Sequence, residues 1–438
     1  MKSALFIISI LLCSVLYGQS FQRADLDQYF DALEKNDKFM GTAAVSVNGR
    51  LLYSRSVGFA DADRQIKNTT ATKYRTGSVS KMYTAVLTLQ AIEENRLTLN
   101  TRLSEFFPEI KNSEKITVEH LLRHRSGIHD FTDSPAFAFY YRSPNSSKHI
   151  IERIEEAGSD FEPGTKMSYS NSNYSLLTYI LEQIYSKTYS ELLSQKITGP
   201  LKLENTFLGS KINIENGEAF SYRMLSEPFK MPETDMSVPT GAGAIVSTSE
   251  DLLKFIEQLL QGDLLSEGSL QKMKTMKEGY GLGIFAVKHD ESEGFGHNGS
   301  IDGFQSELFY FPTTEISVTI LSNGSAVPVK NIRNTVLDAV SGKAIKHPDF
   351  EGVKVPQEIL ERYSGVYSAP DFPLKINISN RNAKLYGQAT GQGEFELTAT
   401  SERVFTFESA DITISFSENG DEMTLNQYGR VTGFKKEK

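Results

Sequence analysis

Strand-like segments occur near both ends of the first three quarters of this chain, and the long stretch between them has a helical pattern. The predicted strands span residues 41–48, 51–58, 281–287, 305–311 and 316–322. Gly49-Arg50 separates the first two strands and predicts a hairpin. Helices are predicted at residues 22–36 and 329–340, and helical periodicity dominates from about residue 78 to 262. We therefore expect an α/β (α+β) unit: an antiparallel sheet flanked by helices, with an inserted helical subdomain.

The pattern changes in the last quarter of the chain. Residues 341–356 are polar and carry two prolines, as a linker would. From residue 357 to 438, apolar and polar side chains alternate, as in Leu374-Ile376-Ile378, and Asn419-Gly420 predicts a tight turn. This alternation predicts a second, small all-β barrel domain at residues 357–438, after a first domain at residues 21–345.

The composition limits the classes of partner. The chain has 438 residues, with 46 Lys and Arg against 55 Asp and Glu, and a net charge of −9. This balance gives no broad positive field for a phosphate backbone, so we expect no nucleic-acid partner. The single cysteine, Cys13, excludes a disulfide framework and a cysteine-based zinc site.

The N-terminus has the pattern of a secretory signal. Lys2 precedes an apolar run over residues 4–16, and small or polar residues follow from Gly18. The run is too short to span a membrane, and no later stretch approaches the ~18 apolar residues that a span needs. We predict a signal peptide at residues 1–18 and an exported, periplasmic or secreted protein. The bulky residues before Cys13 disfavour lipid attachment there.

The first motif that could carry chemistry is Ser78-Val79-Ser80-Lys81. Positions three apart on a helix share a face, so the Lys81 amine can reach the Ser78 hydroxyl. If burial or another cation keeps that amine neutral, it can take the serine proton. At a helix start, free backbone N–H groups also favour negative charge developing at Ser78. The same spacing recurs at Ser269 and Lys272 without other support, so the pattern alone also fits an ordinary surface helix.

Two further motifs carry groups suited to a polar substrate. Tyr169-Ser170-Asn171 offers a phenol that can relay protons and an amide that can orient a substrate group. His297-Asn298-Gly299-Ser300 precedes the strand expected near residue 305, and a glycine beside a strand edge lets a ligand approach the backbone. The Ser300 amide could pair with the Ser78 amide as an oxyanion hole. Taken singly, these motifs are more typical of a turn and of a glycine-rich connection.

Two other clusters have competing interpretations. His120 and His124 lie four apart and could face one metal ion, with His129 nearby. The residues between them lack the Glu of the zincin pattern, which favours a helix end passing into the Ser126-Gly127 turn. An aromatic cluster either lines a hydrophobic acyl pocket or caps the helical subdomain. Its members are Phe131, Phe137, Phe139, Tyr140 and Tyr141.

The conjunction of these motifs, in this order, carries more weight than any one of them. The matching segments are residues 74–81, 116–128, 169–171, 241–243, 247–252, 280–283 and 296–299. With them the chain resembles the serine β-lactamase and penicillin-binding protein superfamily, in its class C β-lactamase, DD-peptidase and D-aminopeptidase branch. The resemblance covers roughly residues 25–340, about three quarters of the chain. The last region resembles the small lipocalin-like β domain that some of these hydrolases carry.

The resemblance implies a role for each motif. Ser78 would be the acyl-accepting nucleophile, Lys81 its proton acceptor and Tyr169 the partner acid/base. Which of Lys81 and Tyr169 takes the first proton stays open. Asn171 would touch the acyl-side amide of the substrate. No metal and no cofactor is implied.

The third motif departs from the family pattern. His297 would occupy the place of the Lys in Lys-Thr-Gly, and Gly299 and Ser300 would complete the substrate-binding and oxyanion side. A neutral His binds a substrate carboxylate less firmly than an always-charged Lys does. The departure disfavours efficient β-lactam hydrolysis and resembles some DD-peptidases and D-aminopeptidases of the branch.

We therefore expect an exported serine hydrolase that forms an acyl-enzyme on a small-molecule or peptide substrate. That substrate would be an amide, a D-amino-acid peptide, a DD-peptide or an ester. The alternatives are a penicillin- or peptide-binding receptor with little turnover and a true class C-like β-lactamase. A third alternative gives the β domain the main role, as a lipid or glycan binder.

Overall fold

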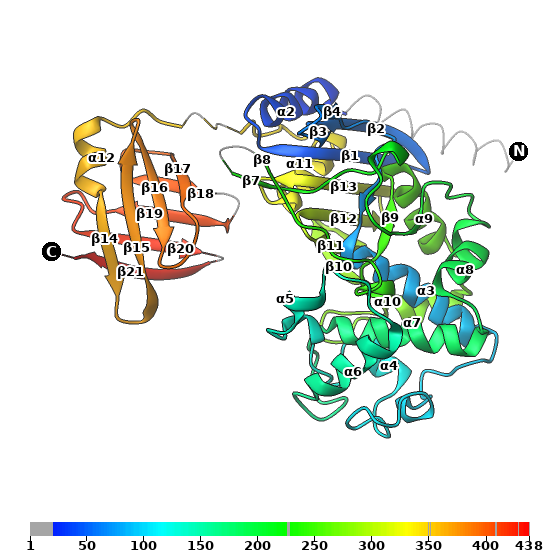
Figure 1. Cartoon of the computed structure of the whole chain (residues 1–438). Coiled ribbons are helices and arrows are strands. Elements are labelled where there is room, and N and C mark those ends of the chain that lie inside the picture. The colour runs from blue at the N-terminus through cyan, green and yellow to red at the C-terminus, as the bar shows by residue number, and fades with distance from the viewer. Residues whose placement is uncertain are drawn as a thin grey trace, which may run out of the picture.

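The computed structural model describes residues 21–225, 228–348, 350, 352–407, 410–427 and 429–437. The predicted signal peptide at residues 1–18, with Cys13, lies outside the described residues. Figure 1 shows a large α/β region and, beside it, a β-barrel made by the C-terminal residues. No described helix has the length and apolar character that crossing a membrane requires.

A six-stranded antiparallel sheet is the framework of the α/β region. In spatial order its strands are β10 (Phe285–His289), β11 (Ser292–Ile301), β12 (Phe304–Phe311), β13 (Ile316–Ser325), β1 (Phe39–Val47) and β2 (Arg50–Val57). Strand β1 pairs with β13, so that Val45 lies opposite Val318. Strands from the two ends of the region thus close one sheet, as the sequence predicts.

Two details of this sheet differ from the prediction. The strand expected at residues 281–287 begins only at Phe285, because the preceding residues form a loop. The segment around His297, expected to precede a strand, is itself strand β11 and pairs with β12 along its second half. Glycines weaken strands in general, but a side chain at Gly294 would collide with the Phe311 ring. Close packing therefore explains a glycine that the sequence pattern alone assigns to a loop.

The remaining elements of the α/β region are helices and short strands. The helices are α2 (Arg23–Lys35), α3 (Ser80–Glu93), α4 (Val118–Leu122), α5 (Phe137–Tyr140), α6 (Ser147–Ala157), α7 (Asn171–Tyr185), α8 (Tyr189–Leu193), α9 (Ser249–Gln261), α10 (Glu267–Lys274) and α11 (Val329–Val340). The short strands are β3 (Phe59–Asp61), β4 (Ile66–Lys67), β5 (Tyr74–Arg75), β6 (Phe207–Leu208), β7 (Tyr222–Met224), β8 (Pro228–Lys230) and β9 (Ile245–Ser247).

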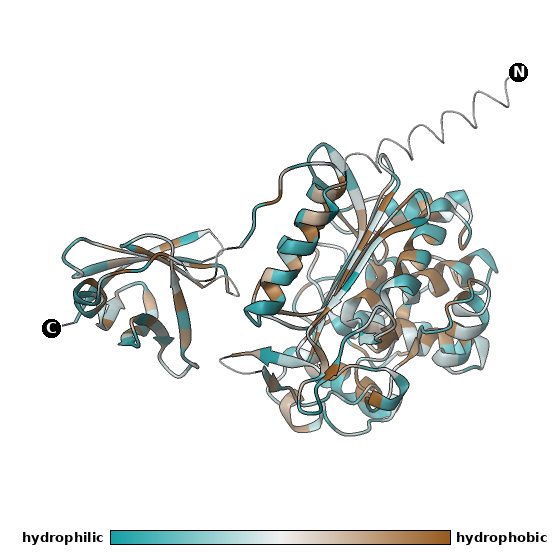
Figure 2. Cartoon of the chain, turned by 90° about the horizontal axis from the view of Figure 1, so that it is seen from above, coloured by the Kyte–Doolittle hydropathy of each residue, from teal (hydrophilic) through white to brown (hydrophobic). Residues whose placement is uncertain are grey.

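Helices cover both faces of the large sheet. Helices α2 and α11, both predicted, share one apolar core with the strands, and Leu26 and Leu33 of α2 are completely buried in it. Helix α9 packs against β1, β12 and β13 and contributes to a different core that extends into the helical region. Figure 2 shows apolar residues gathered where helices meet the sheet. Alternate residues of β12 face the two cores. Leu308 belongs to the core that includes α9, and Phe309 to the core that includes α2 and α11.

The helical region is organised around α3, which packs against α7 and α8. Figure 1 shows α3 between the sheet and helices α4 and α6. Met82, Val86 and Leu89 are almost completely buried, and so are the polar Ser80 and Thr84 on other faces of the helix. A helix buried on nearly every side cannot shift without disturbing the whole core. Its N-terminus is therefore held in a fixed place between the sheet and the helical region.

The C-terminal residues form a closed antiparallel barrel of eight strands. They are β14 (Gly365–Ala369), β15 (Phe372–Arg381), β16 (Lys384–Ala389), β17 (Phe395–Ala399), β18 (Val404–Phe407), β19 (Ile412–Phe416), β20 (Glu422–Gln427) and β21 (Arg430–Lys436). The predicted all-β barrel is confirmed, and Asn419-Gly420 lies in the loop between β19 and β20. The first residues of the predicted range instead form helix α12 (Gln357–Tyr363).

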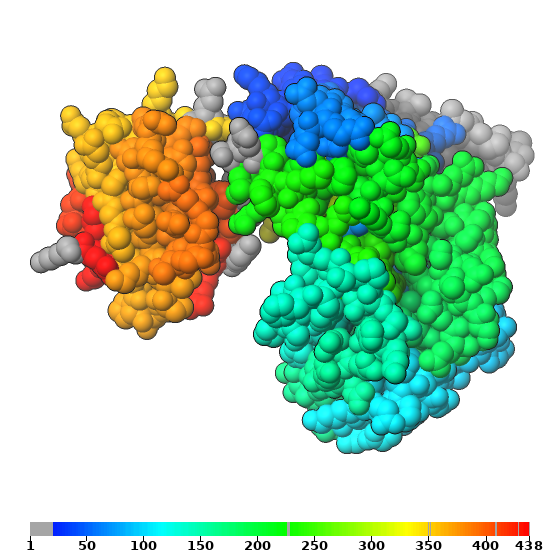
Figure 3. Space-filling view, viewed as in Figure 1, coloured from blue at the N-terminus to red at the C-terminus, as the bar shows by residue number. Residues whose placement is uncertain are grey.

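Apolar side chains fill the barrel. Tyr363 of α12 stacks on Phe416 with ring centroids 4.3 Å apart, and both belong to a core that the α/β region does not share. Tyr367, Leu385 and Ile414 are completely buried in the same core. Figure 3 shows the barrel standing beside the α/β region.

Candidate active site

Ser78 lies in a single 3₁₀ turn, Gly77–Val79, that leads directly into α3. Gly77 adopts a φ of 54°, and a Cβ there would come within 2.7 Å of the Ser300 backbone nitrogen. The left-handed backbone and the close approach both require glycine. The turn that carries Ser78 therefore packs directly on strand β11.

The Lys81 side chain is completely buried beneath Ser78. Its Nζ lies 3.1 Å from Ser78 Oγ, 2.8 Å from Asn171 Oδ1 and 2.8 Å from the Ala242 carbonyl oxygen. The Lys81 amine therefore lies within hydrogen-bond distance of the Ser78 hydroxyl, as predicted. Three neighbours at hydrogen-bond distance use the full capacity of the nitrogen.

Burial lowers the pKa of Lys81 from 10.5 to about 7, and the charge of Asp130 acts in the opposite direction. Near neutral pH a large fraction of Lys81 is therefore the free amine. A neutral amine keeps two N–H donors, which match the Asn171 and Ala242 oxygens, and one lone pair. That lone pair is left to accept the proton of the Ser78 hydroxyl.

Tyr169 borders the Ser78 and Lys81 pair on the side of the solvent. Lys81 Nζ lies 4.8 Å from the centroid of the Tyr169 ring. The Tyr169 side chain is 38% exposed and lines the same cavity as Ser78. Desolvation raises the pKa of its phenol above the usual 10, and a hydrogen bond with Ser78 opposes the rise. The phenol therefore keeps its proton at neutral pH and is placed to donate it.

Asn171 begins helix α7, and its side chain links Lys81 to Asp130. The Asn171 Oδ1 atom accepts from Lys81, while its Nδ2 donates to Asp130 Oδ2 at 2.9 Å and to Thr132 Oγ1 at 3.2 Å. The Asn171 backbone N–H also donates to Asp130 Oδ2, at 2.9 Å. These contacts fix which end of the amide faces the lysine. The role expected for Asn171 on the substrate's amide would require its Nδ2 to leave these partners.

His297 lines the cavity from β11 but offers it no charge. Its side chain is almost completely buried, with Nε2 2.9 Å from the Tyr280 hydroxyl and Nδ1 against the Asn298 carbonyl oxygen. Burial, with a smaller effect of Lys81, lowers the pKa of His297 to about 3. The ring is therefore neutral at physiological pH, as the sequence suggests, and it donates to Asn298 and accepts from Tyr280.

Gly299 brings the backbone of β11 against the Ser78 turn. A Cβ on Gly299 would lie 2.1 Å from the Thr76 carbonyl oxygen and 2.8 Å from the Ser78 nitrogen. The Ser306 hydroxyl of the neighbouring strand donates to the same Thr76 oxygen at 2.7 Å. The backbone of Ser300 is thus adjacent to that of Ser78, the relationship that an oxyanion hole made by their two amides needs.

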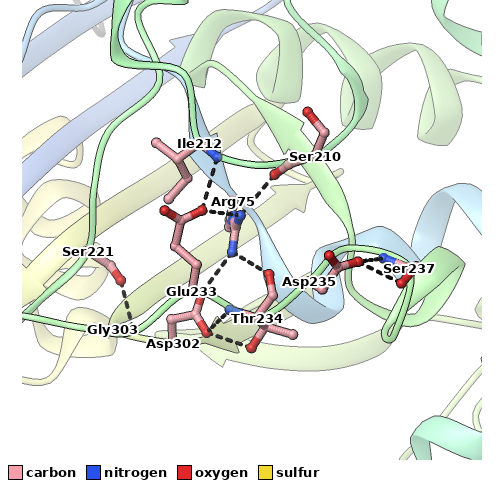
Figure 4. Close-up of polar contacts among 10 residues, drawn as sticks. All are labelled: Arg75, Ser210, Ile212, Ser221, Glu233, Thr234, Asp235, Ser237, Asp302 and Gly303. Carbon is pink, nitrogen blue, oxygen red and sulfur yellow. Dashed lines mark hydrogen bonds and ion pairs between the residues drawn. The ribbon is translucent and has the colours of Figure 1, made fainter. Parts of the chain in front are cut away.

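A buried ion pair ties the same two segments together. Arg75 precedes Ser78 by three residues, and Asp302 follows Ser300 by two. Arg75 Nη1 donates to Asp302 Oδ2 and to the Thr234 carbonyl oxygen, each at 2.9 Å. The Asp302 Oδ1 atom accepts from the hydroxyl of Thr234 at 2.6 Å and from its backbone N–H. Figure 4 shows Arg75 at the centre of this network, which also includes Glu233 and Ser210.

A cavity of about 500 Å³ opens above Ser78. It is lined by Ser78, Met167, Tyr169, Glu278, Gly279, Tyr280, Phe285, His297, Asn298, Gly299 and Ser300. The aromatic cluster proposed as an acyl pocket is absent from this lining: Phe131 is buried in the core of the helical region and Phe139 is 88% exposed. The apolar surface of the cavity comes instead from Met167, Tyr280 and Phe285.

His120 and His124 do not face one another as metal ligands would. The Nδ1 atom of His120 lies 3.4 Å from the Thr117 backbone nitrogen, at the start of α4. His124 points the other way, with its ring 4.2 Å from that of Tyr169. Helix α4 ends at Leu122, before Ser126-Gly127, as the helix-end interpretation predicts.

Sequence reasoning missed Asp130, His124, Tyr280 and Arg75 as parts of the site. Asp130 stands in a loop with no pattern around it that signals chemistry. Tyr280 lies inside the matched segment at residues 280–283, but that segment alone gives it no role. His124 lies inside the matched segment at residues 116–128, where the sequence suggests a helix end or a metal ligand and no contact with Tyr169. Arg75 lies inside the matched segment at residues 74–81, but nothing local indicates a partner more than two hundred residues later.

Comparisons with known proteins show which family the chain is similar to. The Beta-lactamase family model matches residues 26–342. The chain is 29% identical over 243 residues to a teichoic acid D-alanine hydrolase of Staphylococcus aureus, a match that covers 55% of this chain and only 58% of that relative. The D-amino acid amidase of Ochrobactrum anthropi, complexed with L-phenylalanine amide, superimposes with a TM-score of 0.65 at 24% identity, covering 74% of this chain and 99% of that one.

A third comparison includes the barrel. The octameric penicillin-binding protein homologue of Pyrococcus abyssi has a TM-score of 0.67 at 23% identity, and covers 94% of this chain and 99% of its own. At this identity the likeness shows a shared fold alone. The family match itself spans more than two thirds of the sequence and contains every residue described at the cavity. The chain therefore belongs to the Beta-lactamase family, a family of serine hydrolases with the β-lactamase fold.

Proposed function

We propose that the protein is a serine hydrolase that cleaves D-amino-acyl amides, peptides or esters through an acyl-enzyme on Ser78. The observation that carries the proposal is the buried Lys81 Nζ, 3.1 Å from Ser78 Oγ and with a pKa of about 7. A serine hydroxyl is a weak nucleophile unless a neighbouring base accepts its proton. Here the base is held in place by Asn171 and by the Ala242 carbonyl.

In the proposed reaction, Ser78 Oγ attacks the substrate carbonyl carbon while its proton passes to Lys81 Nζ. We assign this first proton to Lys81 because the phenol of Tyr169 is still protonated at neutral pH. The carbonyl oxygen becomes an oxyanion, to which the amides of Ser78 and Ser300 donate.

The leaving group departs with a proton from Tyr169, which Lys81 then reprotonates. The C–N or C–O bond breaks, and the acyl group remains on Ser78 Oγ. Water then attacks the acyl carbonyl, gives one proton to the Tyr169 and Lys81 pair, and the pair returns a proton to Oγ.

The charge of the cavity supports the proposed substrate class. Efficient recognition of a substrate carboxylate needs a cation, and the ring of His297 is neutral and fully hydrogen-bonded. This favours substrates without a carboxylate beside the scissile bond over β-lactams. A D-alanine hydrolase and a D-amino acid amidase among the similar proteins support the D-amino-acyl class.

The experiment is a panel of D-amino-acid amides, D-alanyl esters, DD-dipeptides, cephalosporin chromophores and nitrophenyl esters, run with the wild type and with Ser78→Ala. We expect carboxylate-free D-substrates to turn over fastest and S78A to lose turnover of all of them. Continued turnover after the first equivalent would separate a hydrolase from a receptor that is acylated once. Equal turnover by S78A would contradict the proposal.

We also propose that residues 21–345 and 357–438 are separate domains and that the chemistry belongs to the first. The barrel has its own apolar core, filled by side chains such as Tyr367 and Phe416, which does not suit a lipid-binding role. Deleting the residues after Pro356 should leave the hydrolysis of small esters unchanged. Loss of that activity in a folded, truncated protein would contradict this division. Export, proposed from residues 1–18, would be tested by fractionating cells that express the full chain.

A further inference from the structure

His124 contacts the segment that carries Tyr169 at three points. The residue follows α4 with a φ of 55°, a left-handed conformation that residues other than Gly seldom adopt and that Asn, Asp and His adopt more often than the rest. Its carbonyl oxygen accepts from the Ser168 N–H at 2.8 Å, and its Nδ1 accepts from the Ser170 N–H at 3.1 Å. Both chain neighbours of Tyr169 are thus bonded to one residue.

The ring of His124 also packs against the ring of Tyr169. The two rings stack with centroids 4.2 Å apart and planes at 29°. The other aromatic neighbours of Tyr169, Tyr280 and His297, lie at 6.3 Å and 6.2 Å. Since Tyr169 is partly exposed, His124 is the closest ring that limits its movement away from the cavity.

Neighbouring hydrogen bonds fix the protonation of the ring. The Ser126 hydroxyl donates to Asn173 Oδ1 at 2.6 Å, which turns Asn173 Nδ2 toward His124 Nδ1 at 3.3 Å. With two donors directed at it, Nδ1 carries no proton. The ring is therefore the neutral Nε2–H tautomer, and Nε2 has no hydrogen-bond partner in the described part of the chain.

Burial and nearby groups keep the ring in this state. Desolvation, with smaller contributions from Lys81 and His297, holds the pKa of His124 well below 6.5, and the bond from Ser170 acts in the opposite direction. The titratable side chains that face the ring are Lys81, Tyr169, Tyr174, Tyr280 and His297. A proton on Nδ1 would break the bond from Ser170.

We infer that His124 is a positioning residue for the hydrolysis, holding Tyr169 over Ser78 and Lys81 through the acceptor at Nδ1 and the stacked ring. The inference rests on the function proposed above and adds a residue that does not touch the reacting atoms. Of these two contacts, the hydrogen bond accepted by Nδ1 matters more than the stacking, because it fixes the backbone next to Tyr169.

Two variants separate the effect of the hydrogen bond at Nδ1 from that of the ring stacking. His124→Asn keeps an acceptor near the Nδ1 position and tolerates the left-handed backbone, but it loses the stacking. His124→Phe keeps a stacking ring, leaves the Ser170 N–H without a partner and adds strain at the left-handed backbone. We expect H124F to lower kcat about 10²-fold with little change in KM, as expected for a displaced catalytic group. H124N should lower kcat by less than about tenfold, or about 1.4 kcal/mol.

A second readout distinguishes positioning from a general structural role. If Tyr169 moves away, water reaches Lys81, and the acidic limb of the kcat/KM profile should move to higher pH in H124F and less in H124N. His120→Gln, four residues earlier and outside the cavity, is the control and should keep the wild-type profile. If H124F does not fold, H124Q takes its place, because the longer side chain carries its acceptor away from Ser170.

The result that overturns the inference is wild-type kcat and pH profile in H124F, or a loss in H124N equal to or larger than that in H124F. All variants are first labelled with a fluorophosphonate and mapped by mass spectrometry. A wild type without an adduct on Ser78 would overturn the proposed function and this inference with it. A wild type labelled on Ser78, with H124F labelled equally fast, would overturn only the inference.

Discussion

The guanidinium of Arg75 donates to the carboxylate of Asp302 at 2.9 Å, and both side chains are almost completely buried. Arg75 lies just before the turn that carries Ser78. Asp302 directly follows the last residue of β11, the strand that carries Ser300. One ion pair thus joins the two backbone segments whose amides form the proposed oxyanion hole. Breaking this ion pair should therefore affect catalysis as well as stability.

Replacing Asp302 by Asn should therefore lower kcat about 10²-fold, the effect of removing one oxyanion donor. Breaking a buried pair also lowers the free energy of unfolding, by about 3–5 kcal/mol. Urea unfolding and ester hydrolysis measure the two effects. Glu307→Gln is the matched control, because Glu307 pairs with Arg333 at 2.6 Å, is equally buried and is not among the residues that line the cavity. Equal losses of kcat in D302N and E307Q would contradict a role for the Arg75 pair at the oxyanion hole.

Gly299→Ala should abolish most of the activity. The added Cβ would meet the Thr76 carbonyl oxygen at 2.1 Å, so strand β11 and the Ser78 turn must move apart. Loss of one aligned oxyanion donor lowers kcat by about 10²–10³-fold. Gly268→Ala in α10 is the control, because nothing lies within 4 Å of its Cβ, and it should keep full activity. Wild-type kcat in G299A would show that the two segments need not touch.

The pH dependence of kcat/KM should rise through an apparent pKa near 7. Below that pH Lys81 is protonated and cannot accept the Ser78 proton, and above it the amine is free. His297, with a pKa of about 3, is neutral throughout and should add no limb between pH 5 and 8. A profile of the rate against pH on a neutral ester measures this directly. A profile that is flat from pH 5 to 9 would be inconsistent with Lys81 as the base.

His297→Lys should improve recognition of substrates that carry a carboxylate. The substitution restores the residue type that the third motif of β-lactam-recognising relatives has, and gives the cavity a cation. We expect KM for a cephalosporin chromophore to fall by about tenfold, the equivalent of about 1.4 kcal/mol. KM for a neutral nitrophenyl ester should change little. An equal change for both substrates would argue against charge as the reason for the preference.

Much of the fold was predictable because its signals are local. The periodicity of α2 and α11 and the alternation in the barrel strands depend on neighbouring residues alone. Strand β11 was not predicted as a strand, because its glycines are explained only by distant residues: the Phe311 ring and the backbones of Leu308 and Thr76. Helix α12 was not predicted, because its seven residues are too few for a clear period.

The residues of the candidate site that belong to a local motif were predictable. The residues that distant loops bring to the site were not. The three-residue spacing of Ser78 and Lys81 places their side chains together on one helical turn. Asp130 reaches Asn171 only through the packing of a loop against the start of α7. The Arg75 pair likewise depends on the topology of the sheet, which no local pattern encodes.

The central claim, that Ser78 is made nucleophilic by Lys81, is tested most directly by mapping the covalent adduct of a fluorophosphonate. The wild-type protein should take one adduct, on Ser78, at a rate that rises with pH through about 7. Lys81→Met, which keeps a chain of similar length without the amine, should stay folded and label at least about 10²-fold more slowly. An adduct on another residue, or equal labelling of Ser78 in K81M, would contradict the account.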